Sequence, residues 1–92
     1  MHAVVVTVTI EPGHTEEAQA QLDTDVVPMV KQTPGVIAGY WLARPDGQHG
    51  LSVVLLESEE AARAAADRVP NAPTPDFVTF DSVEVCPVVA SF

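Results

Sequence analysis

The chain is 92 residues long, 47% hydrophobic and 18% charged, and it carries a formal net charge of −9. These values fit one small globular domain over residues 1–92 and exclude a disordered chain. Thirteen acidic residues against four basic ones leave no basic stripe for phosphates, so we expect no nucleic-acid partner and no binding to anionic membranes.

A strand is predicted over Ala3–Ile10, because β-branched residues run through it without a charge or a proline. Successive side chains of a strand point to opposite faces. One face therefore carries Val4, Val6, Val8 and Ile10, and the other carries Val5, Thr7 and Thr9. Neither face is charged, whereas a strand with one side in water normally alternates with polar residues.

The first helix is predicted over about Glu16–Gln32, where apolar residues recur at helical spacing. Thr15 is the better N-cap by residue type, with two glutamates directly after it. Pro28 falls inside the pattern and should kink or loosen the helix, because it lacks an N–H and crowds the carbonyl of Thr24. Pro34 and Gly35 then end the helix.

Two apolar runs, Val36–Ala43 and Leu51–Leu56, are predicted to pair as an antiparallel hairpin. The residues between them include Asp46-Gly47, which suits a turn. Ser58 is then expected to cap a second helix, whose apolar face is made of Ala62, Ala65, Ala66 and Val69.

Three prolines within residues 70–76 predict a loop, and a last strand is expected within Phe80–Val85. Pro87 should place the following residues at a sheet edge or in an irregular extension. Residues 88–92 are unusually apolar for a chain end, so we expect them to pack against another surface.

The predicted order is strand, helix, strand, strand, helix, strand, which is a ferredoxin-like α+β arrangement. Right-handed crossovers place both helices on one face of a four-stranded antiparallel sheet. No element of the chain is left to cover the other face, although the strands are apolar there too. We therefore expect a homodimer whose subunits stack sheet to sheet, the alternative being a face that is merely somewhat apolar in water.

Several residues carry a resemblance to a known family. A helix that ends in Pro34-Gly35, the pair Tyr40-Trp41 in the next strand and the helix start Glu57-Ser58-Glu59-Glu60-Ala61 resemble antibiotic biosynthesis monooxygenase-like domains. The resemblance implies the dimeric α+β barrel fold and a pocket between the sheet and its helices in each subunit. It also implies C-terminal segments that reach the partner.

The same resemblance implies oxygenation of polyphenols without a cofactor, or degradation of haem. The haem-degrading branch carries Asn on the first strand, Trp deeper in the sheet and His on the second helix. This chain has Thr7 and Thr9 on that strand and no His in that helix, so it departs from the pattern at two of the three places. We therefore expect no cofactor.

The candidate ligand-binding residues are Trp41, Tyr40, Arg44, Thr7, His14 and His49. Trp41 and Tyr40 are neighbours on one strand, so at most one of them can line a pocket. Trp41 could stack on a flat aromatic ligand, and core or interface packing is the alternative. Arg44 could bind a carboxylate or phenolate and could equally form a surface ion pair.

Thr7 offers a hydroxyl group, and it could equally be an ordinary strand residue. His14 and His49 lie in predicted loops, where a histidine can act as a general base or simply be solvated. The three histidines show no metal-ligand spacing, so we predict no metal site. The lone Cys86 excludes an internal disulfide.

No charged-then-apolar leader and no apolar run of membrane-spanning length is present, so we expect a cytoplasmic protein. The predicted function is binding of a small hydrophobic or aromatic molecule, with cofactor-free monooxygenation as the chemistry it could support. The alternative is a non-enzymatic dimeric binding or accessory module.

Overall fold

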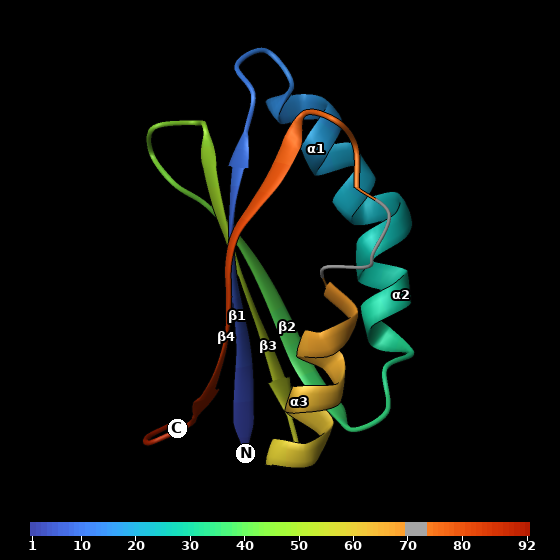
Figure 1. Ribbon diagram of the computed structural model, residues 1–92, viewed down its shortest axis with the longest axis vertical. Coiled ribbons are helices and arrows are strands. Elements are labelled where there is room, and N and C mark those ends of the chain that lie inside the picture. Colours follow the sequence, from blue (N-terminus) through green and yellow to red (C-terminus); the bar gives the residue numbers. More distant parts are fainter. Residues whose placement is uncertain (70–73) are drawn as a thin grey trace.

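A computed structural model describes residues 1–69 and 74–92. Four strands form one antiparallel sheet in the order β2-β3-β1-β4, and helices lie on one of its faces (Figure 1). The strands are β1 (His2–Ile10), β2 (Val36–Ala43), β3 (His49–Leu56) and β4 (Val78–Pro87). The helical segments are α1 (Thr15–Gln21), the π-helical η1 (Leu22–Val26), α2 (Val27–Lys31) and α3 (Glu59–Arg68). The predicted ferredoxin-like α+β fold is confirmed.

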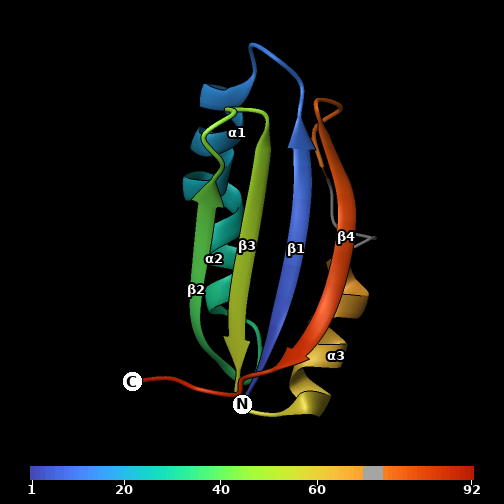
Figure 2. The ribbon, with the colours of Figure 1, turned by 90° about the vertical axis from the view of Figure 1, so that its left-hand side faces the viewer.

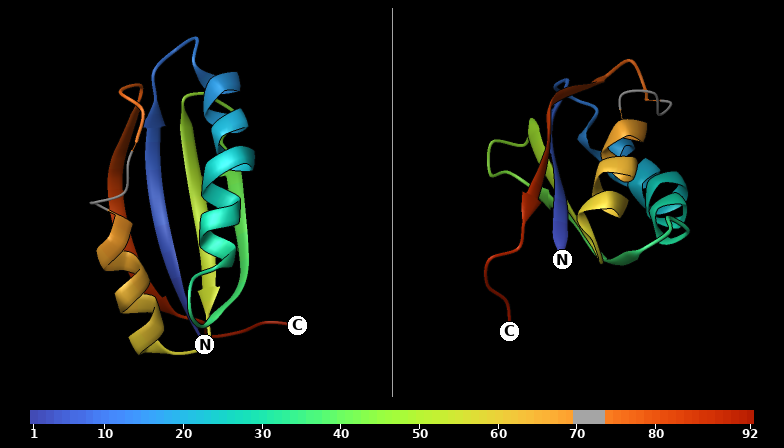
Figure 3. Two further views of the ribbon diagram at one scale, coloured as in Figure 1. Left: turned by 90° about the vertical axis from the view of Figure 1, so that its right-hand side faces the viewer. Right: turned by 60° about the horizontal axis from the view of Figure 1, so that its bottom comes forward.

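The helices divide the covered face between them. Helix α2 packs on β2, and α3 packs on β1 and β4 (Figure 3, left). The opposite face of the sheet meets no other part of the described chain (Figure 2).

The core lies between α3 and the middle of the sheet. Its buried residues are Val4 and Val6 of β1, Leu56 of β3 and Ala62 of α3, and the last two have no exposed surface. Because alanine is small, the α3 backbone can sit close to the sheet. The predicted apolar face of the second helix is confirmed, and the structure shows that the face of β1 with Val4 and Val6 is the one that the helices cover.

The first helix is loosened just before its proline. The N–H of Val27 bonds to the carbonyl of Leu22, five residues back, so the chain makes a wider π-helical turn. Pro28, the second residue of α2, has no N–H to bond the carbonyl of Thr24. The predicted loosening therefore occurs on the N-terminal side of the proline.

The two helix starts differ from one another. Ser58 caps α3 as predicted, because its Oγ accepts a hydrogen bond from the N–H of Ala61 at 3.1 Å. The prediction that Thr15 caps the first helix is wrong. His14 occupies the cap position without a side-chain cap bond, and Thr15 instead donates its hydroxyl to the carbonyl of Gly47 at 2.9 Å.

The last strand is longer than predicted. It extends from Val78 to Pro87 along β1, with a register irregularity opposite Thr7/Val8. Pro87 is tolerated because β4 is an edge strand, whose outward N–H groups need no partner. The loop predicted over residues 70–76 lies partly outside the described residues. No helix of the described chain is long and apolar enough to cross a membrane.

The C-terminal segment leaves the sheet after one hydrogen bond, from the N–H of Val88 to the carbonyl of Met1 at 3.0 Å. It then runs past the end of the sheet, with Val89 and Phe92 almost fully exposed (Figures 2 and 3). These two apolar side chains have little to pack against in residues 1–69 and 74–92 of a single chain.

The cap at Ser58 gives a direct stability test. Replacing Ser58 with Ala should lower the free energy of unfolding by about 1 kcal/mol, since the N–H of Ala61 loses its acceptor. Urea unfolding at fixed protein concentration measures this difference. Ser91→Ala in the exposed C-terminal segment is the matched control, and equal stabilities of the two variants would contradict the assignment.

Candidate functional site

The two neighbouring aromatic residues of β2 point to opposite faces of the sheet. Trp41 pairs with Ser52, which in turn pairs with the buried core residue Val6, so Trp41 lies on the helix-covered face. Tyr40 pairs with Val53 on the open face and is 58% exposed. The structure thus decides which aromatic ring can line a pocket beneath the helices.

A pocket of about 360 Å³ lies between α2 and the edge strand β2. Its walls are mainly apolar, with Val27 and Val30 from the helix and Val36 and Trp41 from the strand. Lys31, in the last turn of α2, is the only charged one among the lining residues that the structure describes. A volume of this size fits a small ligand of a few fused or linked rings.

Gly39 sets the position of the tryptophan ring. A Cβ at residue 39 would lie 2.9 Å from Cη2 and 3.0 Å from Cζ3 of Trp41. The six-membered ring of the indole therefore passes close to the glycine, two residues earlier on the same face of β2. A side chain at residue 39 would clash with the ring, which forms one wall of the pocket.

A bulge shapes the entrance. Val36 pairs with Leu56 and Ala38 with Leu55, so Ile37 is an extra residue in β2. Its side chain lines the pocket and is 56% exposed. The bulge thus adds an apolar edge to the pocket.

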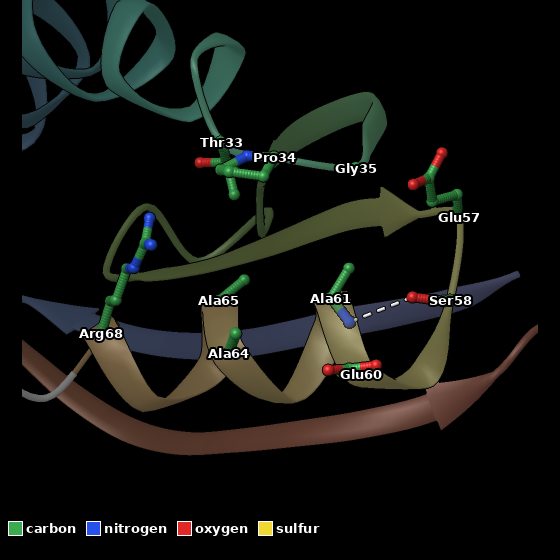
Figure 4. A pocket seen from close by; sticks show the side chains of 10 residues that line it. All are labelled: Thr33, Pro34, Gly35, Glu57, Ser58, Glu60, Ala61, Ala64, Ala65 and Arg68. Carbon is green, nitrogen blue, oxygen red and sulfur yellow. Dashed lines mark hydrogen bonds between the residues drawn. The ribbon is translucent and has the colours of Figure 1, made fainter.

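A second, shallower groove of about 280 Å³ lies between α3 and the turn at Thr33–Gly35 (Figure 4). Alanines of α3 line it, and three charged residues stand along it: Glu57, Glu60 and Arg68. Figure 4 shows Glu57 and Arg68 at opposite ends of the groove. The charged groups of this groove therefore do not converge on one point.

His49 was predicted to lie in a loop but is the first residue of β3, and it pairs with Asp46 in the loop before that strand. Nδ1 of His49 lies 2.7 Å from Oδ2 of Asp46, whose other oxygen accepts the N–H groups of Gln48 and His49. The N–H of Gln48 and the His49 ring lower the pKa of the Asp46 carboxyl. This carboxylate organises the loop, and neither residue lines the two pockets.

His14 joins the start of α1 to the segment before β4. Its ring stacks on Phe77 with centroids 4.6 Å apart and planes 7° apart. Nδ1 of His14 lies 3.2 Å from Oε1 of Glu17, without hydrogen-bond geometry, so the stack is the better-defined contact. His14 therefore has a packing role at this end of the molecule.

The remaining candidates lie away from the Trp41 pocket. Thr7 is on the open face, between Leu51 and Ser82 of the neighbouring strands. Arg44 is exposed in the loop after β2 and forms no ion pair within residues 1–69 and 74–92. Of the six residues singled out from the sequence, Trp41 alone is among those that line the two pockets.

Of the eight described residues that line the Trp41 pocket, seven were not site candidates from the sequence, and Gly39 and Lys31 are the two that bear most on its chemistry. The sequence signal for Gly39 is its position two residues before a tryptophan on the same strand. At that spacing both residues lie on one face, and the large ring can approach the glycine because glycine has no side chain. Lys31 follows the apolar residue Val30 in the last turn of a helix. That pattern alone does not distinguish a pocket residue from an ordinary C-terminal cation.

The donor set of the described residues does not fit a metal centre or a haem iron. None of the three histidines lines either pocket, so neither pocket offers an imidazole as axial ligand. No group of three His, Cys, Asp or Glu side chains in residues 1–69 and 74–92 is placed to hold a metal ion.

Comparison with solved structures finds the same fold in several proteins. The haem-degrading protein MhuD of Mycobacterium tuberculosis, solved with two haems in its active site, matches with a TM-score of 0.80 and 18% identity, over 100% of this chain and 99% of MhuD. SnoaB, a cofactor-independent oxygenase of Streptomyces nogalater, was solved as a point mutant. It matches with a TM-score of 0.68 and 12% identity, over 98% of this chain and 95% of SnoaB.

An antibiotic biosynthesis monooxygenase matches with a TM-score of 0.65 and 19% identity, over 98% of this chain and all of that one. No protein-family model and no curated protein sequence matches this chain. The structural matches establish that the chain has the fold of the antibiotic biosynthesis monooxygenase domain proteins. The resemblance inferred from the sequence is confirmed at the level of the fold.

Proposed function

We propose that this protein is a homodimer that binds a small, flat, aromatic molecule in the pocket between α2 and β2. The observation that supports binding most strongly is the indole of Trp41, whose six-membered ring lies close to Gly39 and lines the pocket beside valine side chains. An aromatic ligand can stack on such a wall while its edges contact the aliphatic residues.

The homodimer is supported by the composition of the open face. Rows of side chains cross the open face from β2 to β1. In these rows, the side chains that come from β2 and β3 are apolar. These residues are Ala38, Tyr40, Leu42, Leu51, Val53 and Leu55. Toward β4 the face turns polar, with Ser82 and Glu84 opposite Thr7 and Val5. The apolar part of the open face is thus concentrated on the hairpin β2-β3.

The total surface of the chain gives independent support. A monomeric protein of 9.8 kDa exposes about 5,200 Å². This chain exposes 6101 Å². The excess is similar to the surface of about 800 Å² that each partner buries in a standard interface. A second copy stacked on the open face is the simplest way to hide it.

Oxygenase chemistry is the second candidate function. It would take place in the second groove, where the carboxylates of Glu57 and Glu60 could accept a proton from a phenolic ligand bound beside α3 and not in the Trp41 pocket. The resulting ring carbanion could react with dioxygen, one oxygen atom entering a ring CH₂ as a carbonyl and the other leaving as water. The alternative from another class is a dimeric binding module without chemistry of its own.

Removing an apolar side chain from the open face tests the dimer. We expect Leu42→Asp to shift the protein toward a monomer, because a buried carboxylate in the interface would be unpaired. Met29→Asp is the matched control, since Met29 is 53% and Leu42 is 51% exposed but Met29 lies on α2. Sedimentation equilibrium at micromolar concentration measures the mass, and a wild-type monomer would contradict the homodimer.

Substituting each of the two aromatic residues tests the binding site. A screen of quinols and flavin-type compounds by thermal shift should yield ligands that also change the fluorescence of Trp41, which is the one tryptophan in the sequence. Trp41→Leu should weaken binding of such a ligand by about tenfold. Tyr40→Leu, on the opposite face, should leave it unchanged, and equal losses in calorimetric titrations would refute the site.

Oxygen uptake distinguishes the enzyme from the binding module. With a phenol that carries a ring CH₂ and binds in the groove beside α3, an enzyme should consume oxygen faster than the protein-free solution. Replacing both Glu57 and Glu60 with Gln should then lower the rate by about a hundredfold, as expected for loss of a general base. Glu84→Gln, on β4, is the control. Uptake at the protein-free rate would leave only the binding function.

A further inference from the structure

We propose that the ligand of the Trp41 pocket is an anion, and that Lys31 binds its carboxylate or phenolate at the entrance. This inference rests on the proposed binding function and narrows the ligand to flat aromatic acids. It starts from the charge distribution within the pocket. Among the described residues that line the pocket, Lys31 is the only charged one and none is acidic.

The ammonium group of Lys31 has no carboxylate partner in the described part of the chain. The ion pairs there join Arg63 to Glu59, and each of the three histidines to a nearby acidic side chain. Thirteen acidic residues are present, so pairing would be easy to arrange. An unpaired lysine beside an apolar, Trp-walled pocket is positioned to supply a counter-charge to a ligand.

The geometry defines a ligand with two ends. One end must be flat and apolar, to lie against Trp41, Val27 and Val30. The other must carry a negative charge at the helix end, where α2 finishes at Lys31 and the lysine stem can cover apolar ligand surface while its ammonium stays in water. An aromatic monocarboxylate or a phenolate meets both requirements.

The alternative is that Lys31 only stabilises the helix, because a cation in the last turn interacts favourably with the helix dipole. That role would not depend on the charge of a ligand. A pair of probes that differ only in charge therefore separates the two roles: 2-naphthoate, which is anionic at neutral pH, and 2-naphthamide, which is neutral and of similar shape.

Calorimetric titration of both probes into the full chain, with Trp41 fluorescence as a second readout, is the test. Wild-type protein should bind 2-naphthoate about fivefold more tightly than 2-naphthamide, as a partly exposed charge pair provides. Lys31→Met should abolish this preference by weakening only 2-naphthoate. Lys31→Arg should restore it, and Arg44→Met, which removes an exposed cation outside the pocket, should leave it intact.

Two results would overturn the inference, and they are distinguishable. If wild type binds both probes equally, or Lys31→Met weakens both equally, Lys31 does not select an anion, while aromatic binding stands. If neither probe binds, the proposed function fails as well. Thermal unfolding of each variant verifies that the substitutions leave the fold intact.

Discussion

The structure depends on an unequal covering of its sheet. Each face of the four strands carries apolar side chains, but the helices of the chain cover one face only. On that face, Leu56 and Ala62 are completely buried. On the other, Tyr40 and Leu42 are more than half exposed, and the C-terminal segment offers Phe92 to solvent. The described chain places no element on the second face, so association with another copy is the simplest way to cover it.

The two faces of the sheet also separate the two roles proposed for β2, which are ligand binding and association with a second copy. Adjacent residues of this edge strand serve different surfaces, because a strand turns successive side chains to opposite sides. Tyr40 belongs to the surface proposed to meet the partner subunit, and Trp41 belongs to the pocket under α2. Binding and association can therefore be altered independently by substitutions at neighbouring positions.

Local sequence signals were sufficient for the strands, for the cap at Ser58 and for the alanine face of α3, because each rests on contacts close in the chain or on simple periodicity. The first helix was harder. Thr15 has the right residue type for a cap, but its hydroxyl bonds the carbonyl of Gly47, 32 residues away, and such a tertiary contact leaves no local signal. The sequence did not determine which face of the sheet carries Trp41. Alternation shows that Tyr40 and Trp41 lie on opposite faces, but it does not show which of the two faces the helices cover. The pocket required the bulge at Ile37 and the packing of α2 on β2, neither of which a pattern of residue types specifies.

The central claim is that a second copy covers the open face, and small-angle X-ray scattering on the wild-type protein tests it most directly. The single chain has a Cα radius of gyration of 12.9 Å. A compact pair of such chains should give about 16 Å by the size scaling of folded proteins, with forward scattering corresponding to twice 9.8 kDa. A radius near that of the single chain, with the mass of one chain at micromolar concentration, would contradict the account.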